Sequence, residues 1–495
     1  MELLYKSTRN SDHKVPSSEA ILDGLAPDGG LYVPDHVPKL ETSLDSLLSC
    51  SYQELAYEIM RLYLTDFTEE ELKDCIAKAY DSKFDTPLIA PLKKVGDVHY
   101  LELFHGATIA FKDMALSILP HLLTTAAKKN QVKNDIVILT ATSGDTGKAA
   151  LAGFADVPGT KIIVFYPKNG VSQIQELQMV TQKGSNVEVV ALHGNFDCAQ
   201  NGVKAMFEDE KLKEELDQHG YQFSSANSIN VGRLVPQVVY YVWAYLQMVN
   251  EGEIKNGQEI NIVVPTGNFG NILAAYYAKE MGLPVHKLLC ASNENKVLFD
   301  FFSTGTYDRN REFILTSSPS MDILISSNLE RLIYEITGED SHRTCDFMEQ
   351  LSKSGTYSIP PAMRKKLTDF VPGYATEEEM RTQIGEVFKA TGYCLDTHTA
   401  VASRVYYDYR KKSGDTTPSV VASTASPYKF VKSVMSSIDS KYEQEDELTL
   451  LREFPKLSGI PMPQAIKDIL DAKVLHDLEC DPERMEEIVK KILKM

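Results

Sequence analysis

The chain has 495 residues, of which 43% are hydrophobic and 24% are charged. This composition is typical of a soluble globular protein and excludes a disordered, collagen-like or coiled-coil chain. The 69 acidic side chains outnumber the 51 basic ones and give a formal net charge of −18. This charge disfavours a nucleic acid or an anionic membrane as partner. At about 150 residues per domain, the length predicts roughly three domains.

The cysteines and histidines indicate neither disulfides nor a metal site. The seven cysteines are an odd number and form no CxxC pair, which favours a reducing cytoplasmic location and no zinc site. The histidines form no HxH or HExxH pattern, and the charged N-terminal segment does not resemble a signal peptide. The apolar stretch 234–250 contains Pro236 and is short for a membrane span, so it predicts a buried helix.

The first 92 residues differ in pattern from the rest of the chain. They combine helical patterns at 51–64 and 69–80 with the segment APDGGLYVP at 26–34. The glycines and prolines of that segment predict a turn followed by an extended piece.

From about residue 95, short runs rich in Val, Ile and Leu alternate with helical patterns, which predicts an α/β fold with parallel sheets. The predicted strands are 99–104, 135–141, 161–166, 187–191, 260–265, 287–291 and 420–423. The predicted helices are 114–128, 147–155, 172–182, 196–209, 236–250 and 271–281. Residues 325–413 are expected to be mostly helical. The last fifty residues predict helices that break at Pro455, Pro461 and Pro463 and pack on the outside.

Ligands of parallel sheets bind at the carboxyl ends of the strands, so the residues after each strand matter most. The strand 135–141 is followed by TSGDTG at 142–147 and then a helix. Small residues at a helix start let backbone N–H groups face an anion. The spacing does not fit a Walker A loop, because two residues separate Gly144 from Gly147 and Ala149 follows Lys148. The alternative is a capped helix start, with Ser143 or Asp145 as N-cap.

A second small-residue turn follows the strand 260–265, at residues 266–271 with the sequence TGNFGN. It also predicts a phosphate-binding turn at a helix start. A dinucleotide fingerprint is the rival interpretation, but Pro265 replaces its first glycine. A simple tight turn is the other alternative.

Two further strand ends carry reactive groups. Thr424 follows the strand 420–423, where it is either a functional hydroxyl or an ordinary helix cap. Lys112 follows the strand 99–104 and lies between Phe111 and Met114. An apolar setting lowers the pKa of a lysine and makes its amine a nucleophile. A solvated surface charge is the alternative for Lys112, and a hydrogen-bonded structural role is the alternative for His105.

Together these motifs resemble the fold type II class of pyridoxal-phosphate enzymes, which includes the β chain of tryptophan synthase. Within that class the chain resembles the threonine synthase family, in its longer microbial and fungal type. The resemblance extends over nearly the whole chain except its last sixty or so residues. The stretches that carry it are APDGGLYVP (26–34), ELFHGATIAFKD (102–113), LTATSGDTGKAA (139–150), SSANSINVGRLVPQ (224–237), VVPTGNFGNILAAYYAK (263–279), SSPSMDILISSNLERL (317–332) and STASPYKF (423–430).

The resemblance implies two parallel-sheet α/β domains, an N-terminal domain and a helical C-terminal extension. The N-terminal domain would span residues 1–92, the catalytic region 93–440 and the extension 441–495. Within the catalytic region, a smaller α/β subdomain would occupy about 130–250, and the remainder would form the larger one.

The resemblance also implies pyridoxal 5'-phosphate as cofactor and assigns residues to it. Lys112 would form the Schiff base with the cofactor, and Thr424 would hydrogen-bond its pyridine nitrogen. The residues expected to hold its phosphate are Gly267, Asn268, Phe269, Gly270 and Asn271. The loop expected to hold the substrate carboxylate and flank the cofactor ring consists of Ser143, Gly144, Asp145, Thr146 and Gly147. Asp145 stands where relatives across the class often have asparagine, which puts in question its expected contact with the 3-hydroxyl of the cofactor.

The implied reaction converts O-phospho-L-homoserine and water to L-threonine and phosphate, without a metal. A substrate phosphate needs cationic or N–H donors, and Arg233 is the first candidate as a bidentate donor. Its alternative is a salt bridge on a helix surface. The neighbouring candidates are Asn227, Ser228 and Asn230, and the weaker ones are His105, Thr108 and Lys168.

Several rival functions stay open from the sequence. A phospho-lyase would convert the same substrate to 2-oxobutyrate, ammonia and phosphate. A serine/threonine dehydratase would lack the APDGGLYVP segment. A non-catalytic relative or a nicotinamide-dependent dehydrogenase would bind no pyridoxal phosphate through Lys112. The expected partner is a small-molecule substrate, and the expected state is a monomer or weak homodimer in the cytoplasm.

Overall fold

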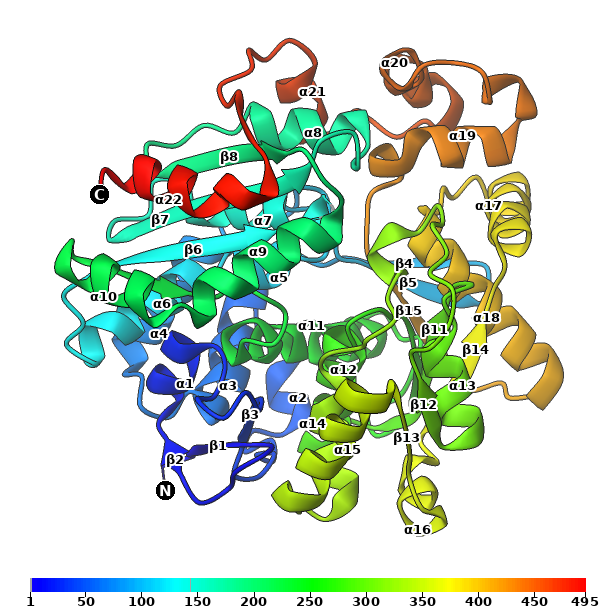
Figure 1. Ribbon diagram of the computed structural model, residues 1–495. Helices are drawn as coiled ribbons and strands as arrows, with labels where there is room; N and C mark the ends of the chain where they lie inside the picture. The colour runs from blue at the N-terminus through cyan, green and yellow to red at the C-terminus, as the bar shows by residue number, and fades with distance from the viewer. Residues whose placement is uncertain (1, 143) are drawn as a thin grey trace.

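The computed structural model describes residues 2–142 and 144–495. Its larger sheet has six strands in the order β14-β11-β10-β15-β5-β4, and only β4 runs antiparallel to its neighbour (Figure 1). The bounds are β4 (Leu92–Val95), β5 (Val98–Glu102), β10 (Ile260–Pro265), β11 (Val285–Ser292), β14 (Phe370–Tyr374) and β15 (Ser419–Ser423). Every residue of β10 and β15 is buried, because helices cover both faces of a parallel sheet.

The smaller sheet has five parallel strands in the order β16-β8-β7-β6-β9. Its strands are β6 (Asp135–Ala141), β7 (Thr160–Pro167), β8 (Val187–Leu192), β9 (Tyr221–Ser224) and β16 (Leu478–Cys480). The helices drawn around it in Figure 1 are α7 (Asp145–Phe154), α8 (Gln173–Val180), α9 (Phe196–Glu208), α10 (Glu210–Gln218) and α22 (Met485–Leu493). All seven strands predicted from the sequence are confirmed to within two residues at each end.

The N-terminal segment forms a small antiparallel sheet in the order β2-β1-β3, with helices beside it. Its elements are β1 (Tyr5–Ser7), β2 (Lys14–Val15), α1 (Ser17–Asp23), β3 (Tyr32–Pro34), α2 (Leu44–Leu47), α3 (Tyr52–Tyr63) and α4 (Glu69–Ala79). Strand β3 is the extended piece predicted after the turn at 26–30. Ser51 with Glu54 and Thr68 with Glu71 form capping boxes that start α3 and α4.

Helix α11 (Val231–Asn250) lies in the middle of the molecule (Figure 1) and is buried along nearly all of its length, as predicted. The helix predicted at 114–128 is instead two helices, α5 (Asp113–Leu116) and α6 (Leu119–Lys129). Pro120 explains the break, because it has no N–H to donate to the carbonyl of Leu116. Helix α12 (Gly270–Met281) follows β10 directly.

The region 325–413 is less helical than expected. It contains the short strand β13 (Thr356–Ser358), paired with β12 (Thr306–Asp308), and the edge strand β14. Strand β14 was not predicted because it contains Pro372 and Gly373, which are rare inside strands but tolerated in an edge strand. The helices from 297 to 438 are α13 (Val297–Thr304), α14 (Leu329–Thr337), α15 (Ser341–Ser354), α16 (Pro361–Arg364), α17 (Glu377–Thr391), α18 (Thr397–Ser413) and α19 (Val431–Ile438).

The C-terminal extension corrects two expectations. Helix α20 (Glu447–Ser458) continues through Pro455, held by its buried side chains Leu450, Leu451 and Phe454. Beyond α21 (Gln464–Leu470), the chain is not purely helical, because β16 pairs in parallel with β8 of the smaller sheet. The domain boundaries expected near residues 92 and 440 stay predictions. In the described ranges, no helix is both long and apolar enough to cross a membrane.

Candidate active site

Three of the predicted motifs meet at the carboxyl end of the larger sheet. The neighbouring strands in that sheet are β10, β15 and β5. Strand β10 leads into the 267–271 loop, and β15 leads into Thr424. Strand β5 leads into residues 103–112, which we call the Lys112 loop. The Lys112 and Thr424 loops are bonded together. The N–H of Phe111 donates to the carbonyl of Thr424 at 2.8 Å, and the N–H of Ser426 donates to that of Ile109 at 3.0 Å. Lys112 is therefore held close to Thr424 although more than 300 residues separate them.

The Lys112 loop contains a strained residue. Ile109 has φ +54°, a left-handed conformation that is rare for a β-branched side chain. The hydrogen bonds from Ser426 to the carbonyl of Ile109 and from Phe111 to the carbonyl of Thr424 hold this residue in place. Such strain persists only where the surrounding structure enforces it, and it is common at active sites.

The Lys112 side chain is 12% exposed, and its amine faces polar groups. Its Nζ donates to the Ser320 hydroxyl at 3.3 Å and lies 3.9 Å from Oδ2 of Asp145. Burial lowers the pKa of Lys112 to about 8, and the nearby cations Lys429 and Arg233 act in the same direction, against Asp145. A substantial fraction of this amine is therefore neutral near physiological pH, as a base or nucleophile requires. The alternative of a solvated surface charge is wrong.

Asp145, at the start of α7, is paired with a lysine that the sequence analysis did not assign. Nζ of Lys429 lies 3.1 Å from Oδ1 of Asp145 and donates to the carbonyl of Thr108 at 2.9 Å. Gln175 donates to the same carboxylate at 2.9 Å. Burial opposes ionisation of Asp145, but Lys429 and Lys112 outweigh it and hold the pKa of the carboxyl well below its usual range. Asp145 is thus a buried anion that joins the smaller sheet to the Lys112 site.

Ser320 is a second residue that the sequence analysis left without a role. Its hydroxyl accepts from Lys112 and lies 3.4 Å from Oδ2 of Asp145. Its backbone N–H donates to Nε2 of His398 at 3.1 Å, and Nδ1 of His398 faces Asp396 at 3.1 Å. Ser320 lies in the motif SSPSM and Lys429 in the motif SPYKF. Their position inside these motifs was the only signal in the sequence that either residue belongs to the site.

The 267–271 loop closes tightly around the start of α12. A Cβ on Gly267 would come within 2.4 Å of the Ser320 carbonyl oxygen, so only glycine fits there. Phe269 has φ +65° and packs against Phe302 and Phe370. Oδ1 of Asn271 accepts from two buried tyrosines, whereas its buried Nδ2 has no hydrogen-bond partner among the described residues. The loop thus presents a helix N-terminus and a free amide donor.

The loop after β6 is close-packed. The N–H groups of Gly144 and Gly147 donate to the Thr142 hydroxyl at 3.0 and 2.9 Å. A Cβ on Gly144 would meet Gln175 at 2.4 Å. Thr146 is half-buried, and Ser143 lies outside the described residues. The hydroxyl of Thr424 takes part in none of the hydrogen bonds between described residues, although its N–H donates to Thr399.

Arg233 is buried, not a surface residue. It lies in the first turn of α11 at 3% exposure, and burial lowers its pKa to about 10. Nη1 donates to the carbonyl of Ala226 at 3.0 Å, and the buried Nε has no hydrogen-bond partner among the residues that the structure describes. No carboxylate in the described part of the chain pairs with it. The surface salt-bridge alternative is wrong, and the guanidinium is free to bind an anion.

Other candidates for the substrate phosphate are occupied by structural bonds. His105 lies between Asp85 and Glu102, whose hydrogen bonds outweigh its burial and raise its pKa to about 9. Thr108 donates to Asp113 through both its N–H and its hydroxyl. Lys168 pairs with Glu479.

The three residues ahead of Arg233 differ in their surroundings. Asn230 caps α11, and its amide donates to the carbonyls of Ile21 and Ser225. Asn227 is exposed and Ser228 half-buried. The geometry therefore favours Arg233 over all these neighbours as the anion ligand.

Comparisons with known proteins match the whole length of the chain. Family profiles match residues 4–80 ("Threonine synthase N terminus"), 82–424 ("Pyridoxal-phosphate dependent enzyme") and 399–491 ("Threonine synthase, C-terminal"). The threonine synthase of Saccharomyces cerevisiae is 36% identical over 490 residues, covering 92% of this chain and 93% of that protein. The chain belongs to the threonine synthase family.

Two further similar proteins are a solved bacterial structure and a human protein. The PLP-bound threonine synthase from Brucella melitensis superposes with a TM-score of 0.87 at 33% identity and covers 100% of both chains. Human "Threonine synthase-like 1" is 39% identical over 457 residues, which cover 90% of this chain. The chain spans only 61% of the length of that relative.

The residues present fit the cofactor of this pyridoxal-phosphate-dependent threonine synthase family. Lys112 supplies a buried amine with a lowered pKa. The 267–271 loop supplies the cradle at Gly267 and the unpartnered amide of Asn271. Thr424 supplies a hydroxyl beside the Lys112 loop. These groups match the aldehyde, phosphate and ring nitrogen of pyridoxal phosphate.

Proposed function

We propose that this chain is a threonine synthase, which converts O-phospho-L-homoserine and water to L-threonine and phosphate. The observation that carries the proposal is Arg233, a buried guanidinium whose charge affects Lys112 and which no carboxylate of residues 2–142 and 144–495 pairs with. An isolated buried cation is costly unless an anion joins it. The phosphate of the substrate is such an anion.

The cofactor would be held by three groups of this chain. Lys112 would bind it covalently, the backbone N–H groups of 267–271 with Asn271 would hold its phosphate, and Thr424 would face its ring nitrogen. A hydroxyl at that position donates a hydrogen bond without forcing the ring to stay protonated. When bound, pyridoxal phosphate supplies the electron sink for removal of protons from the substrate.

In the proposed reaction, Lys112 takes the α proton of the substrate as a neutral amine. The Ser320 hydroxyl accepts a hydrogen bond from this amine and donates one to Asp145. The protonated amine is therefore linked to the Asp145 carboxylate through Ser320. A second proton then leaves Cβ, and Arg233 holds the phosphate while the bond from Cγ to oxygen breaks and the phosphate takes the electron pair. Cγ takes up a proton, water adds its hydroxyl to Cβ, and the proton on Lys112 returns to Cα. The loop at 144–147 keeps the substrate carboxylate in place.

Product analysis by proton and phosphorus NMR tests the proposal. Purified protein loaded with pyridoxal phosphate is incubated with O-phospho-L-homoserine, beside a Lys112→Ala control. We expect threonine and phosphate, absent in the control. Phosphate with 2-oxobutyrate and ammonia would instead assign the phospho-lyase reaction. If the cofactor-loaded protein forms neither set of products, the substrate assignment is refuted.

We further propose a cytoplasmic enzyme of threonine biosynthesis that acts as a monomer or weak homodimer. All seven cysteines are free, which supports a reducing compartment. Size-exclusion chromatography with light scattering over a range of concentrations tests the oligomeric state.

A further inference from the structure

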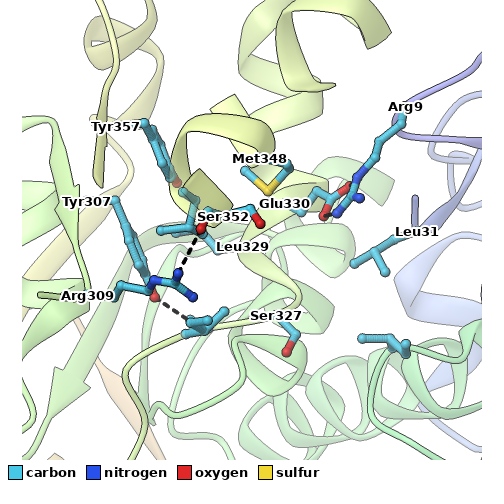
Figure 2. Close-up of a pocket in the computed structure, with 14 residues that line it drawn as sticks. Arg9, Leu31, Tyr307, Arg309, Ser327, Leu329, Glu330, Met348, Ser352 and Tyr357 are labelled. Carbon is cyan, nitrogen blue, oxygen red and sulfur yellow. Dashed lines mark hydrogen bonds and ion pairs between the residues drawn. The ribbon is translucent and has the colours of Figure 1, made fainter. Parts of the chain in front are cut away.

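A separate cavity lies between the N-terminal segment and the region 307–357, and Figure 2 shows its lining. Its volume is about 320 Å³, within the range of small-molecule sites, about 300–1,000 Å³. Neither Lys112 nor Thr424 lines it. We call it the Arg309 cavity, after the charged residue that distinguishes it.

The cavity has one half-buried arginine, Arg309, with no carboxylate partner among the described residues. On one side, Glu330 accepts hydrogen bonds from Nε and Nη2 of Arg9 at 2.9 and 2.8 Å and from the Thr8 hydroxyl at 2.6 Å, so its charge is neutralised. Arg309 lies on the opposite side (Figure 2). Its Nη2 donates to the carbonyl of Ser352 at 3.0 Å, and no carboxylate of the described chain pairs with it. Its remaining N–H groups are available for a charge-assisted hydrogen bond to an anionic group.

The rest of the wall is largely apolar. Leu329, Met348 and Leu351 line it, together with Tyr307 and Tyr357, whose rings stack in parallel at 5.5 Å. An occupant must therefore combine a carboxylate for Arg309 with a compact apolar body. A strongly hydrated anion such as free phosphate would leave this wall unfilled.

One wall of the cavity also supports the loop assigned to the cofactor phosphate. Ser326 donates its N–H to the Tyr307 hydroxyl at 2.8 Å and its hydroxyl to the carbonyl of Gly267 at 2.6 Å. Asn328 donates to the carbonyl of Asn268 through its N–H at 3.1 Å and through Nδ2 at 2.8 Å. A displacement of the segment 326–328 would therefore disturb the bonds that hold the 267–271 loop.

We propose that the Arg309 cavity binds a small carboxylate with an apolar body and that its occupancy changes the affinity for pyridoxal phosphate. The carboxylate binds Arg309, and the apolar body packs on Leu329, Met348 and Leu351. The inference goes beyond the proposed reaction and does not depend on which substrate the enzyme uses.

The test measures binding of phenylacetate and 4-methylpentanoate to the cofactor-loaded protein by calorimetry and ligand-observed NMR. We expect saturable binding with one site per chain. Arg309→Gln weakens binding about tenfold or more, because a charge-assisted hydrogen bond is lost. Arg343→Gln, an exposed arginine on the same helix as Met348 and Leu351, leaves binding unchanged. The neutral phenylacetamide binds at least tenfold more weakly than phenylacetate.

A second variant and a second measurement protect the test from misfolding and address the coupling. Met348→Trp fills the cavity and abolishes binding, with circular dichroism as the check on folding. Saturating phenylacetate shifts the pyridoxal-phosphate dissociation constant of the wild-type chain at least threefold, and that of Arg309→Gln not at all.

Three results would overturn the carboxylate site: no saturable binding of either acid, wild-type binding by Arg309→Gln, or equal binding of the amide. An unchanged cofactor affinity at saturation would overturn the coupling. Failure of the proposed reaction would appear separately, as missing threonine in the product assay.

Discussion

The residues around Lys112 form a buried cluster of charges with an excess of cations. Lys112, Lys429 and Arg233 outnumber Asp145 and Asp113, although the whole chain carries a net charge of −18. At short range in a dry site, such local charges outweigh the distant, screened charges of the surface. The cluster therefore attracts phosphate and carboxylate groups that the rest of the protein repels.

The first prediction concerns the balance between Lys429 and Asp145. The neutral amine of Lys112 captures the cofactor aldehyde, so the capture rate of the apo-protein rises as pH passes the pKa of Lys112, about 8. Lys429→Met removes a neighbouring cation and moves this midpoint upward. Asp145→Asn removes a neighbouring anion and moves it downward. Stopped-flow absorbance of cofactor binding against pH measures both.

Lys432→Met, an exposed lysine three residues from Lys429, is the matched control and keeps the wild-type midpoint. If the pH midpoint moved in the same direction in both site variants, or in neither, the pKa of Lys112 would not be set by Lys429 and Asp145.

The second prediction concerns Arg233 as the phosphate ligand. Arg233→Gln removes charge-assisted hydrogen bonds worth about 1.5–3 kcal/mol, so binding of O-phospho-L-homoserine weakens roughly 10- to 150-fold. Calorimetry in a Lys112→Ala background, which does not turn over, measures the dissociation constant. Arg484→Gln, an exposed arginine paired with Glu487, is the control. Undiminished affinity of the Arg233 variant would exclude this role.

At the scale of elements, each motif occupies the junction between a strand and the helix that follows it. The junction after β10 is tight, because Gly267 lies against the backbone of Ser320 and Phe269 adopts a left-handed conformation. Ser326 and Asn328 then bond to the carbonyls of Gly267 and Asn268. A pre-organised loop binds a phosphate with little ordering cost.

The third prediction tests that junction. Gly267→Ala places a Cβ 2.4 Å from the Ser320 carbonyl oxygen, so the loop must move. We expect the dissociation constant of pyridoxal phosphate to rise at least tenfold, measured by fluorescence titration. Gly96→Ala lies in open space at φ +62°, so it costs about 1–2 kcal/mol of stability and leaves cofactor affinity unchanged. Equal affinities of the two variants would contradict the close approach.

At the scale of the whole molecule, Arg331 joins the N-terminal segment to the catalytic region. Its fully buried guanidinium donates to the carbonyls of Tyr32 and Ile229 and to the side chain of Asn328. One residue of α14 thus contacts β3, the loop ahead of Arg233 and the support of the 267–271 loop. The N-terminal segment is therefore part of the site's framework.

The fourth prediction follows from these bonds. Arg331→Gln removes the donor to the buried carbonyl of Tyr32 and to the half-buried carbonyl of Ile229, so the free energy of unfolding falls by about 1–3 kcal/mol. Urea denaturation measures the loss, and limited proteolysis detects early release of the N-terminal segment. Exposed Arg343→Gln stays within about 0.5 kcal/mol of wild type. An equally small effect of Arg331→Gln would refute the framework role.

The sequence by itself determined the elements whose signal is local. Strands β6 and β10 were predicted with their observed bounds, because both contain buried runs of Ile, Val and Leu. The turns after them were recognised by their small residues. Four strands of the two main sheets were not predicted. Pro372 and Gly373 obscure the pattern of β14, whereas β4, β9 and β16 have only three or four residues with polar ones among them.

Only the tertiary structure decided which side chains meet. Asp145, Ser320, His398 and Lys429 lie far apart in the chain, and the order of strands in the two sheets brings them together. It also decided that Arg233 is a buried cation without a carboxylate partner among the described residues, while His105 is held between two carboxylates. Hydrophobic period and turn chemistry are properties of neighbouring residues, whereas pairing of charges depends on distances that only the packed fold sets.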